Sequence, residues 1–163
     1  MSKAPFIVLG FIVIVLAVTM TSPTYTGHVI NVKDTEYLLD NLDEVKEDYN
    51  ANIDNVPGFF KALFGNEIIK LNIAMDDGTT EILYIKTEKG KINYINENKE
   101  ENFTLDVWAD EQTIDTISAS EDQIMEISNA LKNKKIKYEA TTFKTKVKTK
   151  VAGVAFKVWN LFN

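Results

Sequence analysis

The side chains that most often perform catalysis are scarce in this chain. There is no Cys, and the single His, His28, lies in a short polar segment after an apolar run. Nucleophilic catalysis needs a Ser, Thr or Cys beside a base, and we interpret His28 as a solvated loop residue instead. The chain also lacks a glycine-rich phosphate loop. We therefore predict that the protein is not an enzyme and uses no cofactor.

Acidic residues are the remaining candidates for chemistry, and the chain has 24 of them. The pair Asp76-Asp77, with Asp106 or Asp110 as a third ligand, could form a carboxylate metal site, but the spacing of a calcium loop is missing. Asp77-Gly78 is explained as a turn. No two carboxylates stand out as the pair that glycoside hydrolysis needs. We predict no catalytic residue and no metal site.

The amino end carries the strongest placement signal. Lys3 is followed by an uncharged run from Ala4 to Met20, APFIVLGFIVIVLAVTM. At about 1.5 Å per residue this run reaches the lower limit for crossing a hydrocarbon core of about 30 Å. A cleaved signal peptide is the alternative, although its best cleavage sequence, residues 17–19, ends in Thr. We predict that residues 1–20 are a membrane anchor, or else a signal peptide.

The charges beside this run predict its orientation. The amino group and Lys3 precede it, whereas Lys33 after it is offset by Asp34. Positive charge favours the cytoplasmic side. We therefore expect a single-pass membrane protein with a cytoplasmic N-terminus, a juxtamembrane linker at residues 21–33 and an extracytoplasmic domain at residues 34–163.

Hydrophobic spacing predicts an α+β domain. Residues 35–53 place Leu38, Leu42, Val45 and Tyr49 on one helical face, which we interpret as core packing. From residue 67 to residue 109 the period changes to alternation, with turns at residues 76–78 and 88–90. The four predicted strands there cover residues 69–73, 82–85, 92–95 and 102–108, with Phe103, Leu105 and Val107 on one face.

The rest of the chain supplies covering helices and one more strand. Residues 110–117 are helical, Ser120–Gln123 is a capping box for a helix that ends near Lys132, and residues 135–138 are a strand. Residues 147–162 have the spacing of an amphipathic helix. The predicted fold class is α+β, an antiparallel β-meander of about five strands covered by helices and preceded by a single transmembrane helix.

Aromatic residues are concentrated in two places that could line an apolar pocket. One group follows the break at residues 56–58, and the other lies in the predicted terminal helix. Such residues either fill a core or line a pocket or membrane contact. The pocket candidates are Phe59, Phe60, Phe64, Phe156, Trp159 and Phe162.

Charge is unevenly distributed in this chain of net charge −6. Residues 34–54 are strongly acidic, and residues 132–157 are strongly basic. Alternating lysines in the basic part either protect an edge strand or contact anionic lipid headgroups. The candidates are Lys144, Lys146, Lys148 and Lys150. No Arg is present, so bidentate base recognition is missing and a nucleic-acid partner is not expected.

The order of elements resembles the sterol carrier protein 2-like (SCP2-like) superfamily. The resemblance covers residues 34–163 and rests on the Asp77-Gly78 hairpin, the Gly90 turn, the segment from Phe103 to Asp122, and Lys134–Tyr138 before the last helix. The glycines that usually flank the last strand in that family are replaced here by Asn133 and Glu139-Ala140. The string from Val56 to Glu67 also resembles segments of small anchored archaeal proteins.

The resemblance implies a non-enzymatic domain with an apolar tunnel between sheet and helices, in which a lipid or other acyl ligand lies under the last helix. Filled cores and lined tunnels share one composition, so a second hypothesis stands beside the first. In it the domain is a structural or protein-interaction subunit of a cell-envelope complex with a filled core. The expected partners are the membrane with a lipid in the first case, and an envelope protein in the second.

Overall fold

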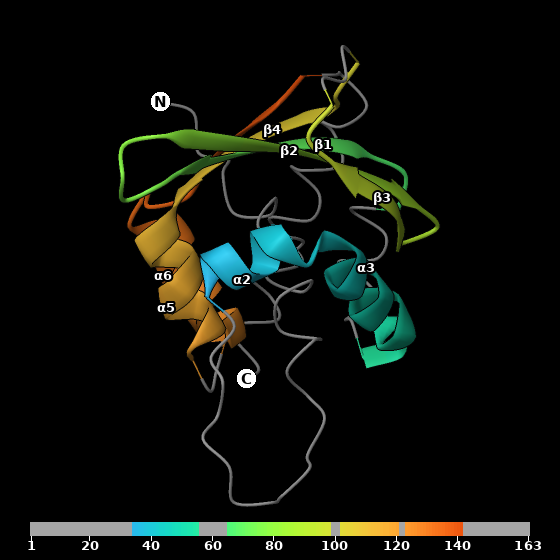
Figure 1. Ribbon diagram of the computed structural model, residues 1–163, viewed down its shortest axis with the longest axis horizontal. Helices are drawn as coiled ribbons and strands as arrows, with labels where there is room; N and C mark the ends of the chain where they lie inside the picture. Colours follow the sequence, from blue (N-terminus) through green and yellow to red (C-terminus); the bar gives the residue numbers. More distant parts are fainter. Residues whose placement is uncertain (1–33, 56–64, 99–101, 121–122, 142–163) are drawn as a thin grey trace, which may run out of the picture.

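The alternating segments of the chain form a five-stranded sheet with helices packed on one face (Figure 1). The computed structural model describes residues 34–55, 65–98, 102–120 and 123–141. The elements in chain order are α2 (Thr35–Asp40), α3 (Leu42–Ala51), the 3₁₀ helix η1 (Ile53–Asn55), β1 (Ile68–Ala74), β2 (Thr80–Glu88), β3 (Lys91–Asn96), β4 (Leu105–Asp110), α5 (Glu111–Ser118), α6 (Gln123–Lys132) and β5 (Lys137–Ala140). The predicted α+β class is confirmed for this part of the chain.

The first three strands are the meander that the turn residues predict. β1 pairs antiparallel with β2, and β2 pairs antiparallel with β3. Gly78 in the first turn has φ +89°, a backbone conformation that glycine adopts without a steric penalty. Asp77 Oδ1 accepts hydrogen bonds from the backbone N and the Oγ1 of Thr79, at 2.8 and 2.6 Å. These bonds hold the pKa of the Asp77 carboxyl below its usual range and explain this residue as part of a turn.

The meander does not extend to the fourth strand, where the prediction was wrong. The strand order is β3-β2-β1-β4-β5, and β4 pairs parallel with β1. Thr104 fixes this placement, because its backbone N donates to Ile68 O at 2.7 Å and its Oγ1 accepts from Ile68 N at 3.1 Å. The chain between β3 and β4 is too long for a tight hairpin turn, and it returns β4 across the sheet to the far side of β1.

Phe103 also departs from its predicted face. The strand begins only at Leu105, and the Phe103 ring lies 5.5 Å from Lys70 Nζ. Lys70 is in register with Asp106, so its side chain lies on the face opposite to Leu105. Because the backbone leaves strand geometry at Thr104, the alternation of faces cannot be extended back to Phe103.

The predicted helix at residues 35–53 is present but is broken at Asn41. In an unbroken helix the carbonyl of Tyr37 would accept from the backbone N of Asn41, but here it accepts from the Asn41 side-chain Nδ2 at 2.8 Å. Asn41 has φ −126° and ψ 38°, so the chain changes direction between α2 and α3. The apolar stripe survives the break, with Leu38, Val45 and Tyr49 buried and Leu42 partly buried.

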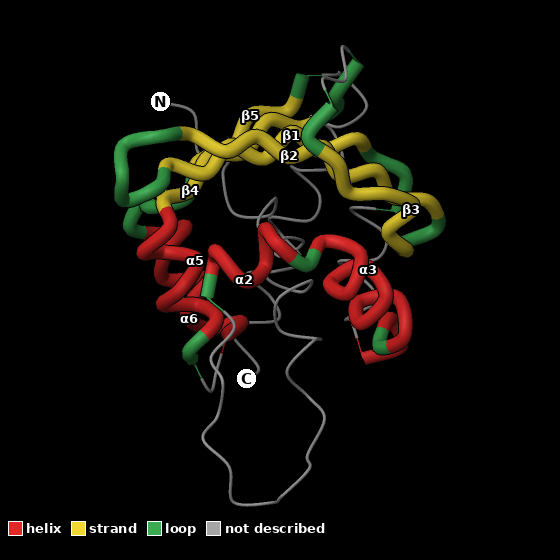
Figure 2. Tube along the Cα trace, viewed as in Figure 1, coloured by secondary structure: helices red, strands yellow, loops and turns green. Residues whose placement is uncertain are grey.

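The described elements after β4 follow their predictions within a few residues. Asp110 caps α5 by accepting from the backbone N of Thr113 at 2.7 Å. Helix α6 ends at Lys132, and β5 pairs antiparallel with β4 at the sheet edge. Figure 2 shows all these helices on one side of the sheet. The core forms between the two layers, where Ile69, Leu105, Val107 and Ile117 are each at most 1% exposed.

Several predicted features lie outside the described residues. They are the anchor and linker at residues 1–33, the aromatic group at residues 59–64, residues 121–122 of the capping box, the lysines at positions 144–150 and the terminal helix at residues 147–162. In the four ranges that the structure describes, no helix has the length and apolar character needed to cross a bilayer.

Tyr49 connects α3 to Gly90 in the turn between β2 and β3. Its buried hydroxyl makes the stability of the domain depend on pH in the alkaline range. Its side chain is 1% exposed, and its hydroxyl donates to Gly90 O at 2.8 Å. Burial raises the pKa of this phenol above its ordinary value of 10.0. The unfolded chain therefore releases the proton near pH 10 while the folded chain retains it. The stability that Tyr49 contributes is present below about pH 10 and is lost as the pH rises further.

We predict that Tyr49→Phe flattens the alkaline loss of stability. Near neutral pH the variant should lose about 1 kcal/mol, because the Gly90 carbonyl loses its donor. Above about pH 10 the wild-type free energy of unfolding should fall more steeply than that of the variant, by up to about 1.4 kcal/mol per pH unit. Urea unfolding from pH 7 to pH 11.5 measures both slopes. Parallel slopes would contradict the buried phenol.

Candidate functional site

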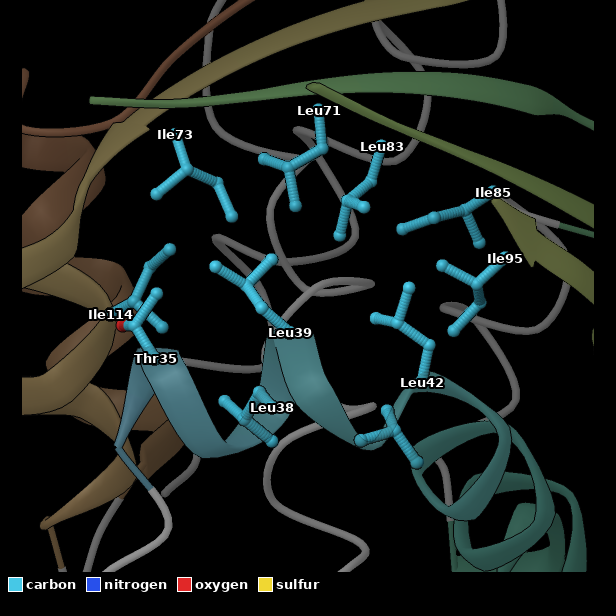
Figure 3. A pocket seen from close by; sticks show the side chains of 11 residues that line it. Thr35, Leu38, Leu39, Leu42, Leu71, Ile73, Leu83, Ile85, Ile95 and Ile114 are labelled. Carbon is cyan, nitrogen blue, oxygen red and sulfur yellow. The ribbon is translucent and has the colours of Figure 1, made fainter. Parts of the chain in front are cut away.

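An apolar pocket lies between α2 and the sheet. Figure 3 shows side chains from β1, β2 and β3 facing side chains from α2 and the start of α3, with Ile114 of α5 at one end. The lining residues that the structure describes are Thr35, Leu38, Leu39, Leu42, Val45, Leu71, Ile73, Leu83, Ile85, Ile95 and Ile114. All of them except Thr35 are aliphatic, so the pocket can recognise hydrocarbon and little else.

The sheet side of the pocket follows directly from strand alternation. Leu71 and Ile73 are two residues apart on β1, and Leu83 and Ile85 are two residues apart on β2. Leu71 and Leu83 are register partners, so the two pairs form one continuous aliphatic surface. Ile95 on β3 pairs with Ile85 and extends this surface by one strand.

The free space in the pocket is small. Its cavity volume is about 50 Å³. Pockets that hold drug-sized ligands usually measure about 300–1,000 Å³. Leu39, Leu42 and Ile95 are only partly buried, whereas Leu71, Leu83 and Ile85 are at most 5% exposed. The space is therefore closed along β1 and β2 and least covered at Leu39 of α2, Leu42 of α3 and Ile95 of β3.

Helix α2 is held at its amino end by one carboxylate of α5. Asp115 Oδ1 accepts from the backbone N of Thr35 at 2.8 Å and from Thr35 Oγ1 at 2.6 Å. Thr35 is 1% exposed and is the one polar residue in the lining. Among the described contacts, the Asp115 carboxylate is the one basic group beside the Thr35 hydroxyl. We call the Thr35–Asp115 contact the α2 latch.

At its other end α2 is separated from α3 by the break at Asn41. The helix has only six residues, which is too short to be stable without tertiary contacts. A short helix with a hydrogen-bonded latch at one end and a non-helical residue at the other can move as a unit. The position of α2 over the sheet therefore depends on the latch and on the packing of Leu38 and Leu39.

We predict that Asp115→Asn weakens the latch. The amide keeps one acceptor oxygen but loses the charge that strengthens both bonds, so the free energy of unfolding should fall by about 1 kcal/mol. Backbone amides of α2 should exchange with solvent deuterium faster, while those of β1 and β4 keep their protection. Asp43→Asn is the matched control, because Asp43 is exposed and pairs only with Lys46 on its own helix. Equal effects of the two changes would argue against the latch.

The predicted pocket residues lie in parts of the chain outside the described ranges, so they stay a prediction. Phe59, Phe60, Phe64, Phe156, Trp159 and Phe162 all lie outside the described residues, as do the lysines at positions 144, 146, 148 and 150. The described lining uses residues that sequence analysis assigned to packing. Leu39 and Thr35 were missed altogether, although Leu39 beside Leu38 widens the apolar stripe of the predicted helix.

The described residues hold no grouping of three or more His, Cys, Asp or Glu side chains able to bind a metal ion. Asp106, considered as a third ligand with Asp76-Asp77, instead accepts from Asn72 Nδ2 at 2.7 Å and lies 4.0 Å from Lys70 Nζ. Asp110, the other third ligand considered, caps α5. These carboxylates are therefore used in the sheet and at a helix end.

The chain matches no family model and no curated protein. Among solved structures it is similar to one described as "UbiJ-SCP2 Ubiquinone synthesis protein", with a TM-score of 0.42 and 6% sequence identity. That similarity covers 69% of this chain and 92% of the other. A likeness of this degree carries no argument about ligand or activity, so the site is judged on its own geometry.

Proposed function

We propose that this protein is a membrane-anchored, non-enzymatic SCP2-like domain that binds a lipid or other apolar ligand between its sheet and its helices. The observation that carries the proposal is the aliphatic pocket under α2. The part of the lining that the structure describes offers hydrocarbon contact, and its one polar residue, Thr35, is already hydrogen-bonded to Asp115. Such a surface favours an acyl or isoprenoid chain over a polar molecule.

Ligand binding requires the pocket to enlarge. A cavity of about 50 Å³ has room for a few methylene groups at most. Movement of α2 would enlarge it without disturbing the sheet, because the latch and the Asn41 break lie at the two ends of that helix. In this proposal the described arrangement is the closed form, and a ligand that binds better to the open form shifts the population toward it.

The alternative function is a structural or protein-interaction subunit of an envelope complex. The observation that favours it is the same small volume, because a cavity of about 50 Å³ is close to a filled core. In this case α2 is ordinary packing, and its acidic outer side, together with that of α3, faces a partner protein. Asp34, Glu36 and Asp40 are exposed there.

Mass spectrometry of extracted lipid separates the two functions. Residues 28–163 retain the described core and can be purified without detergent once the predicted anchor is removed. A lipid present at about one molecule per chain would support the carrier function. A lipid-free protein that also fails to take up a fluorescent fatty acid would argue for the filled core, and affinity capture from envelope extracts would then be the next step.

The membrane placement is a separate part of the proposal. It holds that residues 1–20 anchor the chain with a cytoplasmic N-terminus and that the domain is extracytoplasmic. Alkaline extraction of cell membranes should leave the full-length chain in the pellet. Protease added to right-side-out cells should cut the domain. A soluble chain of reduced mass would instead indicate a cleaved signal peptide.

A further inference from the structure

A corner of the sheet combines an exposed tryptophan with three lysines. Trp108 on β4 is 38% exposed, so part of its indole ring is open to solvent. Lys137 on β5 is its register partner, and both strands are adjacent in the sheet. Lys134 and Lys135, in the connection from α6 to β5, line the same shallow hollow of about 240 Å³. We call these four residues the Trp108–lysine corner.

The corner lies at one end of a cross-strand row on the sheet face that the described helices leave uncovered. Ile82, Asn72 and Trp108 are in register on β2, β1 and β4, and Ile82 is 36% exposed. Asn72 Nδ2 donates to Val107 O at 2.8 Å and also to Asp106, so its polarity is already satisfied. Ala74, two residues after Asn72 on β1, lines the hollow beside Trp108.

The backbone conformation of Lys134 ends α6 beside the corner. Lys134 has φ +59°, in the left-handed region that glycine or asparagine usually occupies at the end of a helix. Its backbone N donates to Leu131 O at 3.1 Å, as expected for a residue that terminates α6. Lys89 in the β2–β3 turn has a similar φ of +52°, so the backbone conformation of Lys134 is explained by the end of α6.

The distribution of charge favours one orientation of the domain toward an anionic surface. The exposed carboxylates of α2 and α3 lie on the helix side of the sheet, where Figure 1 shows these two helices. Among the residues that line the hollow, Asp110 is the one acid, and its Oδ1 accepts from Thr113 N at the start of α5. Two more acids lie on this sheet face: Asp106, which accepts from Asn72 Nδ2 and lies 4.0 Å from Lys70 Nζ, and the exposed Glu139, which is its register partner. Three lysines therefore outnumber the one exposed acid beside them. In a chain of net charge −6, an anionic surface would therefore repel the helix side and attract this corner.

We propose that the Trp108–lysine corner docks on the surface of an anionic bilayer. Trp108 would lie at the level of the headgroups, where indole rings are enriched, and the three lysines would contact lipid phosphates. The inference rests on the proposed function only for the anchor, which would keep the corner within reach. A linker of residues 21–33 spans at most about 45 Å when extended.

The test follows Trp108 in full-length protein. The chain has two Trp residues, so Trp159→Phe leaves Trp108 as the sole reporter. The variant is mixed with vesicles of phosphatidylcholine with brominated chains, either alone or with an equal amount of phosphatidylglycerol. We expect Trp108 fluorescence to be quenched about twofold or more in the anionic vesicles and little in the neutral ones. Raising the salt from about 0.05 M to about 0.5 M should reverse most of the quenching.

Charge-removal variants connect the quenching to the corner. Lys134→Gln, Lys135→Gln and Lys137→Gln together should lower apparent affinity for anionic vesicles by about a hundredfold, or about fivefold for each lysine. Lys134→Gly should lose about fivefold while relieving the positive φ, so misfolding cannot explain its effect. The matched control replaces Lys86, Lys89 and Lys91 of the β2–β3 hairpin by Gln and should retain the quenching.

The remaining outcomes are also decisive. Equal quenching in both vesicle types, or an unchanged signal in the corner triple variant, would overturn the docking proposal. So would a shift of Trp108 emission by inorganic phosphate alone, since the corner would then be a site for a small anion. Flotation with neutral vesicles reports the anchor separately. A chain that floats only with anionic vesicles supports docking without an anchor, whereas one that floats with neither overturns both. None of these readouts depends on the pocket under α2.

Discussion

Replacing Leu105 by Ala is expected to lower the free energy of unfolding by about 2–5 kcal/mol. Leu105 is 1% exposed and lies where three strands meet. Its register partners are Ile69 on β1, which is fully buried, and Ala140 on β5. Truncation removes apolar burial and leaves a cavity that the surrounding strands can only partly close. Urea unfolding monitored by circular dichroism would measure the loss as a lower midpoint with an unchanged slope.

Ile82→Ala is the matched control for this substitution. Ile82 is also aliphatic and lies on a strand of the same sheet, but it is 36% exposed on the opposite face. Its truncation should cost about 1 kcal/mol or less. If the two variants lost the same stability, the burial of Leu105 at the centre of the sheet would be wrong.

A double-mutant cycle extends the prediction to the strand order. Ile69 and Leu105 face each other across the parallel pair, so changing both should give a coupling energy of about 0.5 kcal/mol or more. Ile92 on β3 is separated from β4 by β2 and β1. Its coupling to Leu105 should be within about 0.3–0.5 kcal/mol of zero. A meander, with β4 beside β3, would reverse these two results.

The contrast between the first three strands and the fourth shows where sequence reasoning succeeds. The turns at Asp77-Gly78 and Lys89-Gly90 carry residues whose backbone conformations produce hairpins, so β1, β2 and β3 could be predicted locally. No turn residue determines which strand pairs with β4. It depends on Thr104 reaching Ile68, a contact between residues 36 positions apart, and on burial of Leu105 against Ile69. Such non-local contacts leave no periodic signal.

The break in the helix predicted at residues 35–53 could not be predicted from hydrophobic periodicity. The stripe of Leu38, Val45 and Tyr49 was correct because the break at Asn41 changes direction without changing which side chains meet the sheet. The break itself arises from one side-chain amide that replaces a backbone donor. Asn disfavours helix interiors for this reason, but many helices tolerate it, so its presence alone does not predict a break.

The candidate pocket was the least predictable feature. Leu71, Leu83 and Ile114 have the same spacing and chemistry whether they fill a core or surround a space. What distinguishes them is the position of α2 over the sheet, which depends on the latch between Thr35 and Asp115, 80 residues apart. The predicted aromatic residues lie outside the described ranges and stay a prediction, and the lining that the structure describes is aliphatic apart from Thr35.

Leu39→Phe tests the pocket most directly. Leu39 lies on α2, is partly buried and points toward the sheet in Figure 3. A phenyl ring at this position would occupy most of a cavity of about 50 Å³. If the domain binds an apolar ligand here, uptake of a fluorescent fatty acid should fall tenfold or more, equal to at least about 1.4 kcal/mol. Stability without ligand should be unchanged or rise by about 0.5–1 kcal/mol, because a cavity is filled.

Met125→Phe provides the comparison for this last variant. Met125 is on α6, is 58% exposed and is not part of the described lining, so it adds a ring of similar size at the surface. Uptake should be unchanged in this control. The combination that matters is a stable Leu39→Phe protein that has lost uptake, because a loss of binding without a loss of folding assigns the ligand to the space under α2. A stable Leu39→Phe protein with full uptake would place the ligand elsewhere, and a protein destabilised by 1–3 kcal/mol would indicate that the space under α2 is already filled.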